Sequence, residues 1–147
     1  MMKITKRRYP ILGMANELKE IRRQLDGKSQ AVIGHLVKLC LYPNNGLKNH
    51  WRTEVWAILH RVPKYTKTNK PPKAQFIFNS TWGINHDTID GDIELTIDEY
   101  GEPEISVEFD AIYSRLSDYF SWIANELSDR MIILKKDVYA KLDELGM

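Results

Sequence analysis

The feature of this sequence that most limits what the chain can fold into is the recurrence of apolar residues at helical spacing. Between Pro10 and Gly27 these residues lie three or four positions apart, at Ile11, Met14, Leu18, Ile21 and Leu25. That spacing predicts an amphipathic helix over residues 11–26, which opens after Pro10 and ends at Gly27. Ser29 is expected to cap a second helix over residues 29–42. Because apolar residues cover most of its circumference, this second helix should be the central one.

The same spacing predicts further helices along the chain. Residues 50–62 carry one apolar face and are followed by Pro63, while residues 110–128 form a strongly amphipathic pattern. A last short helix is expected over residues 137–145, before Gly146. Residues 73–82 follow two prolines that favour a helix start, although a strand at 75–79 is the alternative.

Between residues 92 and 109 the apolar spacing changes to two. Ile93, Leu95 and Ile97 alternate with polar residues, and the alternation resumes over residues 105–109. This predicts a β-hairpin. Its polar, mainly acidic face would consist of Glu94, Thr96, Asp98, Glu104, Ser106 and Glu108. The alternative is a helix through Ile89, Ile93, Ile97 and Tyr100 that ends at Gly101, and Gly91 together with the β-branched isoleucines favours the hairpin over it.

These elements predict a mainly α fold of the α+β class: a bundle of about five to six helices with one acidic β-hairpin near residues 92–109. An all-α fold is the alternative. A chain of 147 residues has the size of one domain, 1–147, in which residues 1–9 are a candidate flexible basic tail. An apolar fraction of 43% excludes disorder for most of the chain.

The sequence also indicates the compartment. The longest apolar runs are four residues, so we expect no membrane span and no membrane partner. The first residues lack the apolar region of a secretory signal. With Cys40 as the single cysteine, no intramolecular disulfide and no cysteine-based zinc site can form. A cytoplasmic protein is the expectation.

The net charge of +1 conceals a strong asymmetry along the chain. Residues 1–75 contain 16 Lys and Arg against 4 Asp and Glu, a net charge of +12, whereas residues 76–147 contain 5 against 16, a net charge of −11. The two halves either neutralise each other in the fold or present separate faces. Separate faces would suit an anionic partner, a basic partner or head-to-tail self-association.

A family resemblance covers residues 16–62. It is carried by the runs Glu17-Leu-Lys-Glu-Ile21 and Ile33-Gly-His-Leu-Val-Lys38, followed by Tyr42-Pro43, Trp51-Arg52 and Glu54. These runs resemble the first half of an all-helical bacterial family known as domain of unknown function twenty-nine. In that family a His-Leu-Leu-Lys helix precedes a proline and a helix containing Ser-Trp. The resemblance implies a helical fold and no activity, because the family is uncharacterised.

No catalytic motif, nucleotide-binding loop or cofactor-binding motif occurs in the sequence, so we expect no cofactor and favour a non-enzymatic function. The histidines His35, His50, His60 and His86 have no mutual spacing of three or four, so we expect no metal site. Arg52 and His60 resemble the Arg and His of helical ribonucleases, which makes a helical hydrolase or nuclease a remote alternative. Their separation of eight places them two turns apart.

Two binding functions stay open. The first prediction is a protein-interaction or adaptor module, whose hairpin and charged faces bind another protein or a second copy of the chain. The alternative is nucleic-acid binding through the basic half, with Trp51, Trp56 and Tyr65 as stacking faces. The candidate anion-binding residues are Arg7, Arg8, Lys48, Arg52, Lys64, Lys67, Lys70 and Lys73. We favour the adaptor function.

Overall fold

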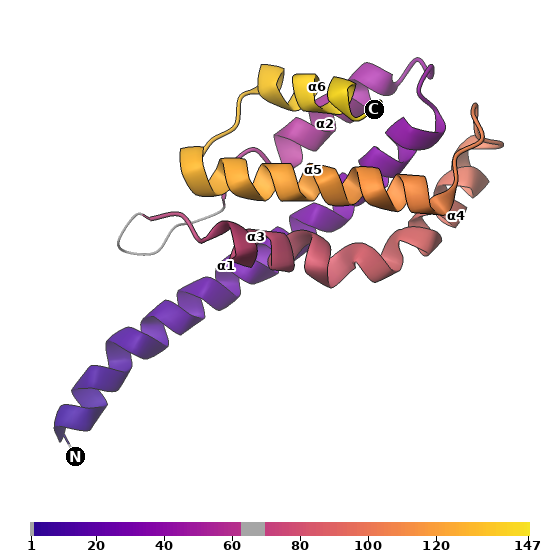
Figure 1. The fold of residues 1–147 in the computed structure, drawn as a ribbon. Coiled ribbons are helices and arrows are strands. Elements are labelled where there is room, and N and C mark those ends of the chain that lie inside the picture. Colours follow the sequence, from indigo (N-terminus) through magenta and orange to yellow (C-terminus); the bar gives the residue numbers. More distant parts are fainter. Residues whose placement is uncertain (1, 63–69) are drawn as a thin grey trace.

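The computed structural model describes the backbone of residues 2–62 and 70–147, and the side chains from Asn16 onward within those ranges. Six α-helices follow one another there (Figure 1). They are α1 (Met2–Leu41), α2 (Lys48–Ile58), α3 (Ala74–Phe78), α4 (Ile89–Tyr100), α5 (Phe109–Arg130) and α6 (Lys135–Glu144). A π-helical turn at Asn79–Gly83 and a 3₁₀ turn at His86–Thr88 join α3 to α4. The mainly helical bundle is confirmed, and the described residues form it in the all-α version, without a strand.

The prediction of two helices on either side of Gly27 is wrong, because α1 is one helix of 40 residues. It begins at Met2 rather than after Pro10, so residues 2–9 form its first turns. A glycine inside a helix costs about 1 kcal/mol, and burial of Leu25 and Ile33 on either side of Gly27 outweighs that cost. Ser29 is an interior residue whose hydroxyl donates a hydrogen bond to the Asp26 carbonyl at 2.8 Å.

The C-terminal half of α1 lies at the centre of the bundle. It packs against α2, α4, α5 and the π-helical turn, and Leu36 is completely buried. From α5, Phe120 enters the same core and stacks on Trp82, with ring centroids 5.7 Å apart. The other end of α1 projects from the bundle, as the indigo ribbon in Figure 1 shows. The first buried residue among its described side chains is Ile21.

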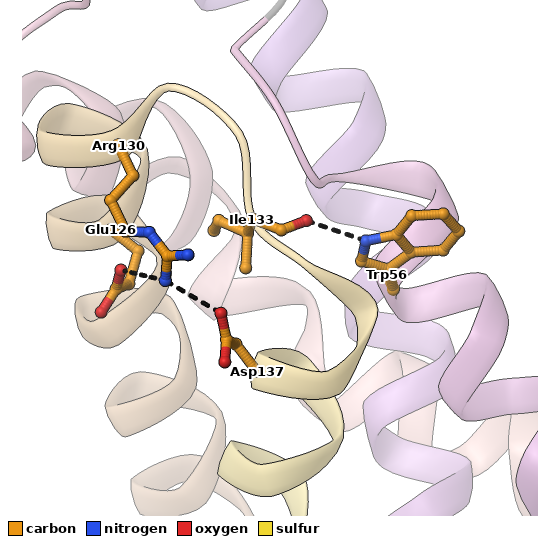
Figure 2. A network of polar contacts seen from close by, with 5 residues as sticks. All are labelled: Trp56, Glu126, Arg130, Ile133 and Asp137. Atoms are coloured by element: carbon orange, nitrogen blue, oxygen red, sulfur yellow. Dashed lines mark hydrogen bonds and ion pairs between the residues drawn. The ribbon is translucent and has the colours of Figure 1, made fainter.

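Polar contacts attach the connection between α5 and α6 to α2 (Figure 2). Arg130 near the end of α5 donates to Glu126 at 3.4 Å and to Asp137 of α6 at 2.9 Å. The indole Nε1 of Trp56 donates to the Ile133 carbonyl at 2.9 Å. The Trp56 bond satisfies a backbone carbonyl of the irregular segment between the helices, and the Arg130–Asp137 pair joins α5 to α6, which packs beside α2.

The β-hairpin prediction for residues 92–109 is wrong. Residues 89–100 form α4, and residues 101–108 connect it to α5 without regular structure. The helical alternative is confirmed, including its end at Gly101, where φ is 87°. The isoleucines at positions 89 and 93 point into the core from consecutive turns, and that burial outweighs the weak strand preference of their side chains.

The remaining helix predictions are confirmed with shifted ends. The helix expected over residues 50–62 is α2, which ends four residues earlier, and those over 110–128 and 137–145 are α5 and α6. The segment expected over residues 73–82 is helical over residues 74–83, as α3 and the π-helical turn, rather than a strand. Gly146 has a φ of 76°, as expected of a residue that ends a helix. No helix in the described ranges is long and apolar enough to cross a bilayer.

Candidate interaction groove

An apolar groove lies where α4, the C-terminal end of α1 and the connection 101–108 meet. Its volume is about 280 Å³. Leu41 and Ile93 are buried, whereas Ile105 and Phe109 are 39% and 53% exposed. The residues lining this groove are Leu41, Ile93, Ile97, Glu102, Pro103, Ile105, Ser106, Val107 and Phe109. Seven of these nine residues are apolar, so a ligand of the groove must itself present apolar groups.

Hydrogen bonds to the end of α1 hold the connection in place as one wall of the groove. Gly101 adopts φ 87° and ψ −166°, a region open to glycine, and turns the chain away from α4. The Tyr42 hydroxyl donates to the Gly101 carbonyl. The Glu104 amide donates to the Leu41 carbonyl at 3.0 Å, and the Glu104 carboxylate accepts the Asn44 amide at 2.7 Å. The wall is therefore formed before any ligand arrives.

An aromatic cluster supports the same end of the bundle. The Tyr100 ring lies edge-on to Trp51 at 5.5 Å and tilted against Tyr42 at 5.8 Å, measured between centroids. The Lys38 ammonium lies 5.2 Å from the Tyr100 ring. Burial, together with the nearby Glu104 carboxylate, raises the pKa of Tyr42. Its hydroxyl therefore stays protonated and keeps donating to the connection.

The stretch that supplies the lining of the groove, apart from Leu41, is entirely acidic in its charged residues. Residues 89–110 contain nine Asp and Glu and no Lys or Arg. Glu102 lines the groove, and Glu108 and Asp110 flank Phe109 at its edge. These carboxylates are exposed, so they create a negative potential around an apolar surface. A cationic and apolar ligand fits both properties.

The residues predicted for the acidic hairpin face do not share one face. Glu94 and Asp98 are exposed on α4, whereas Thr96 is buried and donates to the Asp92 carbonyl at 2.7 Å. Glu104 belongs to the wall, Ser106 lines the groove, and Glu108 precedes the first turn of α5. The helical period distributes these positions around α4, and the connection has a path of its own.

Sequence reasoning missed the two most accessible apolar residues of the groove. Ile105 and Phe109 are expected from the hairpin pattern to lie on its covered apolar face, and both are exposed. The available signal was Pro103 after Gly101. Two residues that interrupt regular structure, followed by apolar residues, are typical of an irregular segment that carries a binding surface.

Among the predicted nucleic-acid residues whose side chains the structure describes, Arg52 is taken up by contacts inside the bundle. Arg52 is only 8% exposed, pairs with Asp143 at 2.6 Å and stacks on the Tyr139 ring at 4.6 Å. Trp51 is buried, so neither residue is available to a phosphate or a base. Lys48 is half-buried, while Lys70 and Lys73 are exposed. Lys64 and Lys67, and the side chains of Arg7 and Arg8, lie outside the described residues.

The histidines are not gathered into a site. His35 is half-buried with no hydrogen-bond partner at Nδ1, and burial, with a contribution from Lys38, lowers its pKa. His60 stacks on Trp56 with centroids 4.9 Å apart, so it is not brought together with Arg52, which turns toward α6. Among the described side chains, no group of three His, Cys, Asp or Glu is placed to hold a metal ion.

Comparison of the chain with known proteins identified no relative. No family model matches the chain, and neither a curated protein nor a solved structure matches it. The resemblance of residues 16–62 to domain of unknown function twenty-nine therefore stays a prediction.

Proposed function

We propose that this protein is an interaction module, or adaptor, that binds a basic amphipathic segment of a protein partner in the groove. The observation that carries the proposal is the coincidence of an apolar groove of about 280 Å³ with a stretch of nine carboxylates and no basic residue. Apolar side chains of the partner would enter the groove, and its Lys and Arg would lie against Glu102, Glu108 and Asp110.

The apolar and charged contributions have different roles in this proposal. Burial of apolar area at Ile105 and Phe109 supplies affinity, at about 25 cal/mol per Å². The carboxylates speed association and exclude acidic partners. Because they are exposed, salt screens them over a Debye length of about 8 Å at physiological ionic strength. Added salt should therefore weaken binding without abolishing it.

Little conformational entropy is lost in ordering the wall of the groove for binding. The connection is already attached to Leu41, the last residue of α1, and to Tyr42 and Asn44, which follow the helix. A preformed surface loses less conformational entropy on association than a mobile one. The proposal places the interaction in the cytoplasm, where a single free cysteine such as buried Cys40 is usual.

A peptide titration tests this function. The probe is a fluorescent amphipathic helical peptide of about 20 residues, built from Leu and Lys and followed by anisotropy. Replacing Phe109 by Ser should weaken binding about tenfold or more, because an anchoring side chain is lost. The matched control is Leu95→Ser, since Leu95 is more exposed, at 68%, but does not line the groove. Equal losses in the two variants would contradict the proposal.

A second peptide separates charge from apolar contact. It keeps every Lys of the first peptide and carries Ser in place of Leu. We expect it to bind far more weakly at about 0.15 M salt, because exposed charges alone contribute little there. Equal binding of the two peptides would show that the groove takes no part.

Nucleic-acid binding is the outcome that would replace this proposal. Contacts to phosphates would make log affinity fall with log salt, at a slope of about −0.7 to −0.9 per contact. Sub-micromolar binding of an oligonucleotide near 0.15 M salt, lost when Lys64, Lys67 and Lys70 are all changed to Glu, would move the site to residues 48–73. We expect only weak retention, because the half of the chain with a net charge of −11 repels the same polyanion.

A further inference from the structure

We infer that the groove receives the projecting start of α1 from a second copy of this chain, an inference that rests on the proposed function of the groove. This segment, residues 2–20, precedes Ile21, which is the first buried residue among the described side chains of α1, and is called the arm below. The arm and the groove then form one contact between two molecules.

The arm has the chemistry that the groove requires. Among its charged residues, five are basic and two, Glu17 and Glu20, are acidic. The basic residues are Lys3, Lys6, Arg7, Arg8 and Lys19. Its apolar residues Ile4, Ile11 and Leu18 are seven positions apart, with Met14 between the last two, which is the spacing of one helical face.

This apolar spacing continues into the bundle, where the same face is covered. Ile21 and Leu25, the next two positions of the series, are buried, while Leu18 is half-buried. The ribbon in Figure 1 shows the start of α1 extending away from the other helices. An apolar helical face is stable in water only when another surface buries it, and a second molecule can supply that surface.

The arm cannot reach the groove of its own molecule. Leu41, the last residue of α1, lines the groove, and Met2 is the first residue of the same helix. A helix of 40 residues is about 60 Å long, and α1 is continuous through Gly27. In Figure 1 the N-terminus and the connection after α4 lie at opposite ends of the molecule. A second molecule must therefore supply the arm.

Charge complementarity favours a second copy over an arbitrary partner. The chain's asymmetry, +12 over residues 1–75 and −11 over residues 76–147, is then satisfied between molecules. Within one molecule, the ion pairs of Arg52 with Asp143 and of Arg23 with Glu20 involve neither Glu102 nor Glu108. If two molecules each place their arm in the groove of the other, a closed dimer forms. If each arm binds a further molecule instead, the contact produces an open-ended oligomer.

The test uses charge-reversed full-length chains and measures mass against concentration by sedimentation. The arm variant carries Lys6→Glu, Arg7→Glu and Arg8→Glu, and the groove variant carries Glu102→Lys and Glu108→Lys. We expect the unmodified chain to associate as its concentration rises and each variant alone to stay monomeric. An equimolar mixture of the two variants should associate again, because opposite charges then meet. The matched control, Lys135→Glu with Lys136→Glu on α6, should associate like the unmodified chain.

The outcomes separate this inference from the function on which it rests. A monomer at every concentration whose groove still binds the Leu and Lys peptide would overturn the second copy as partner and leave the groove's function standing. Failure of the peptide to bind would overturn both. Association that survives in the arm variant alone would show that another surface is responsible, and would also overturn the inference. Since the mixture must recover what each variant has lost, misfolding of a variant cannot imitate the expected result.

Discussion

Helices α4 and α5 follow each other in the chain and differ in how clearly the sequence encodes them. Over the 22 residues of α5 every strongly apolar position after Phe109 repeats at helical spacing, and the buried face is continuous from Ile112 to Leu127. The 12 residues of α4 bury only Ile89, Ile93 and Thr96. A long series of apolar residues fits a helix alone, whereas a short series fits either a helix or a strand.

The ambiguity of α4 comes from three residues. Ile93, Leu95 and Ile97 fit a strand, while Ile89, Ile93 and Ile97 fit a helix. In the helix, Ile93 and Ile97 are one turn apart and face the core, whereas Leu95 lies on the opposite side and is exposed. The helix thus buries a threonine and exposes a leucine, which is the reverse of what the strand would do.

The largest expected effect concerns the core face of α5. Changing Phe120 to Ala removes a buried ring that stacks on Trp82, and should lower the free energy of unfolding by about 3–5 kcal/mol. Urea denaturation measures the loss. Ser121→Ala, on the exposed side of the same helix, should change stability by less than about 0.5 kcal/mol. A small effect at Phe120 would show that the core does not depend on this helix.

The next prediction distinguishes the two interpretations of α4. Thr96→Lys places a charge at a buried position and should lower the free energy of unfolding by about 2–3 kcal/mol, whereas Leu95→Lys should be nearly neutral. Both are measured by urea denaturation. The opposite ranking, with Leu95 sensitive and Thr96 tolerant, would restore the hairpin.

Two glycines of the same region should respond with opposite signs. At Gly101 a side chain meets a φ of 87°, so Gly101→Ala should lower the free energy of unfolding by about 1–2 kcal/mol. At Gly91, inside α4, an added Cβ would have no atom within 4 Å, so Gly91→Ala should raise stability by about 0.4–1 kcal/mol. Thermal unfolding followed by circular dichroism measures both. A loss at Gly91 would argue against the helix.

The smallest effect is a pH dependence that originates in α4. Burial raises the pKa of Asp92 above the ordinary value of 3.8, although a hydrogen bond from Thr88 opposes the shift. The folded state therefore holds this proton more tightly than the unfolded state does. Its stabilising contribution is complete at low pH and is lost as the pH rises past 3.8 through the raised pKa. The stability of the unmodified chain relative to Asp92→Asn should fall across that range in urea titrations, and a constant difference would contradict the shift.

Much of the fold could be predicted from residues whose pattern has one interpretation. The helical faces of α2, α5 and α6 could be derived from apolar spacing, because burial of one face determines a helix locally. The break at Gly27 could not be excluded, since a glycine's local preference is weak and only packing on both sides decides it. Of the groove, the sequence placed the carboxylates near residues 94–108 but not the apolar wall beside them.

By itself the sequence determined that this chain is mainly helical, that its charge is divided between its two halves and that its aromatic residues suffice for a core. Only the tertiary structure decided that residues 89–100 are a helix, that Arg52 and Trp51 are buried, and that Ile105 and Phe109 are exposed beside carboxylates. The physical reason is the distance along the chain between the residues that interact. Helical spacing acts between residues three or four positions apart, whereas the groove depends on contacts between Leu41 and Glu104, which lie far apart in the chain.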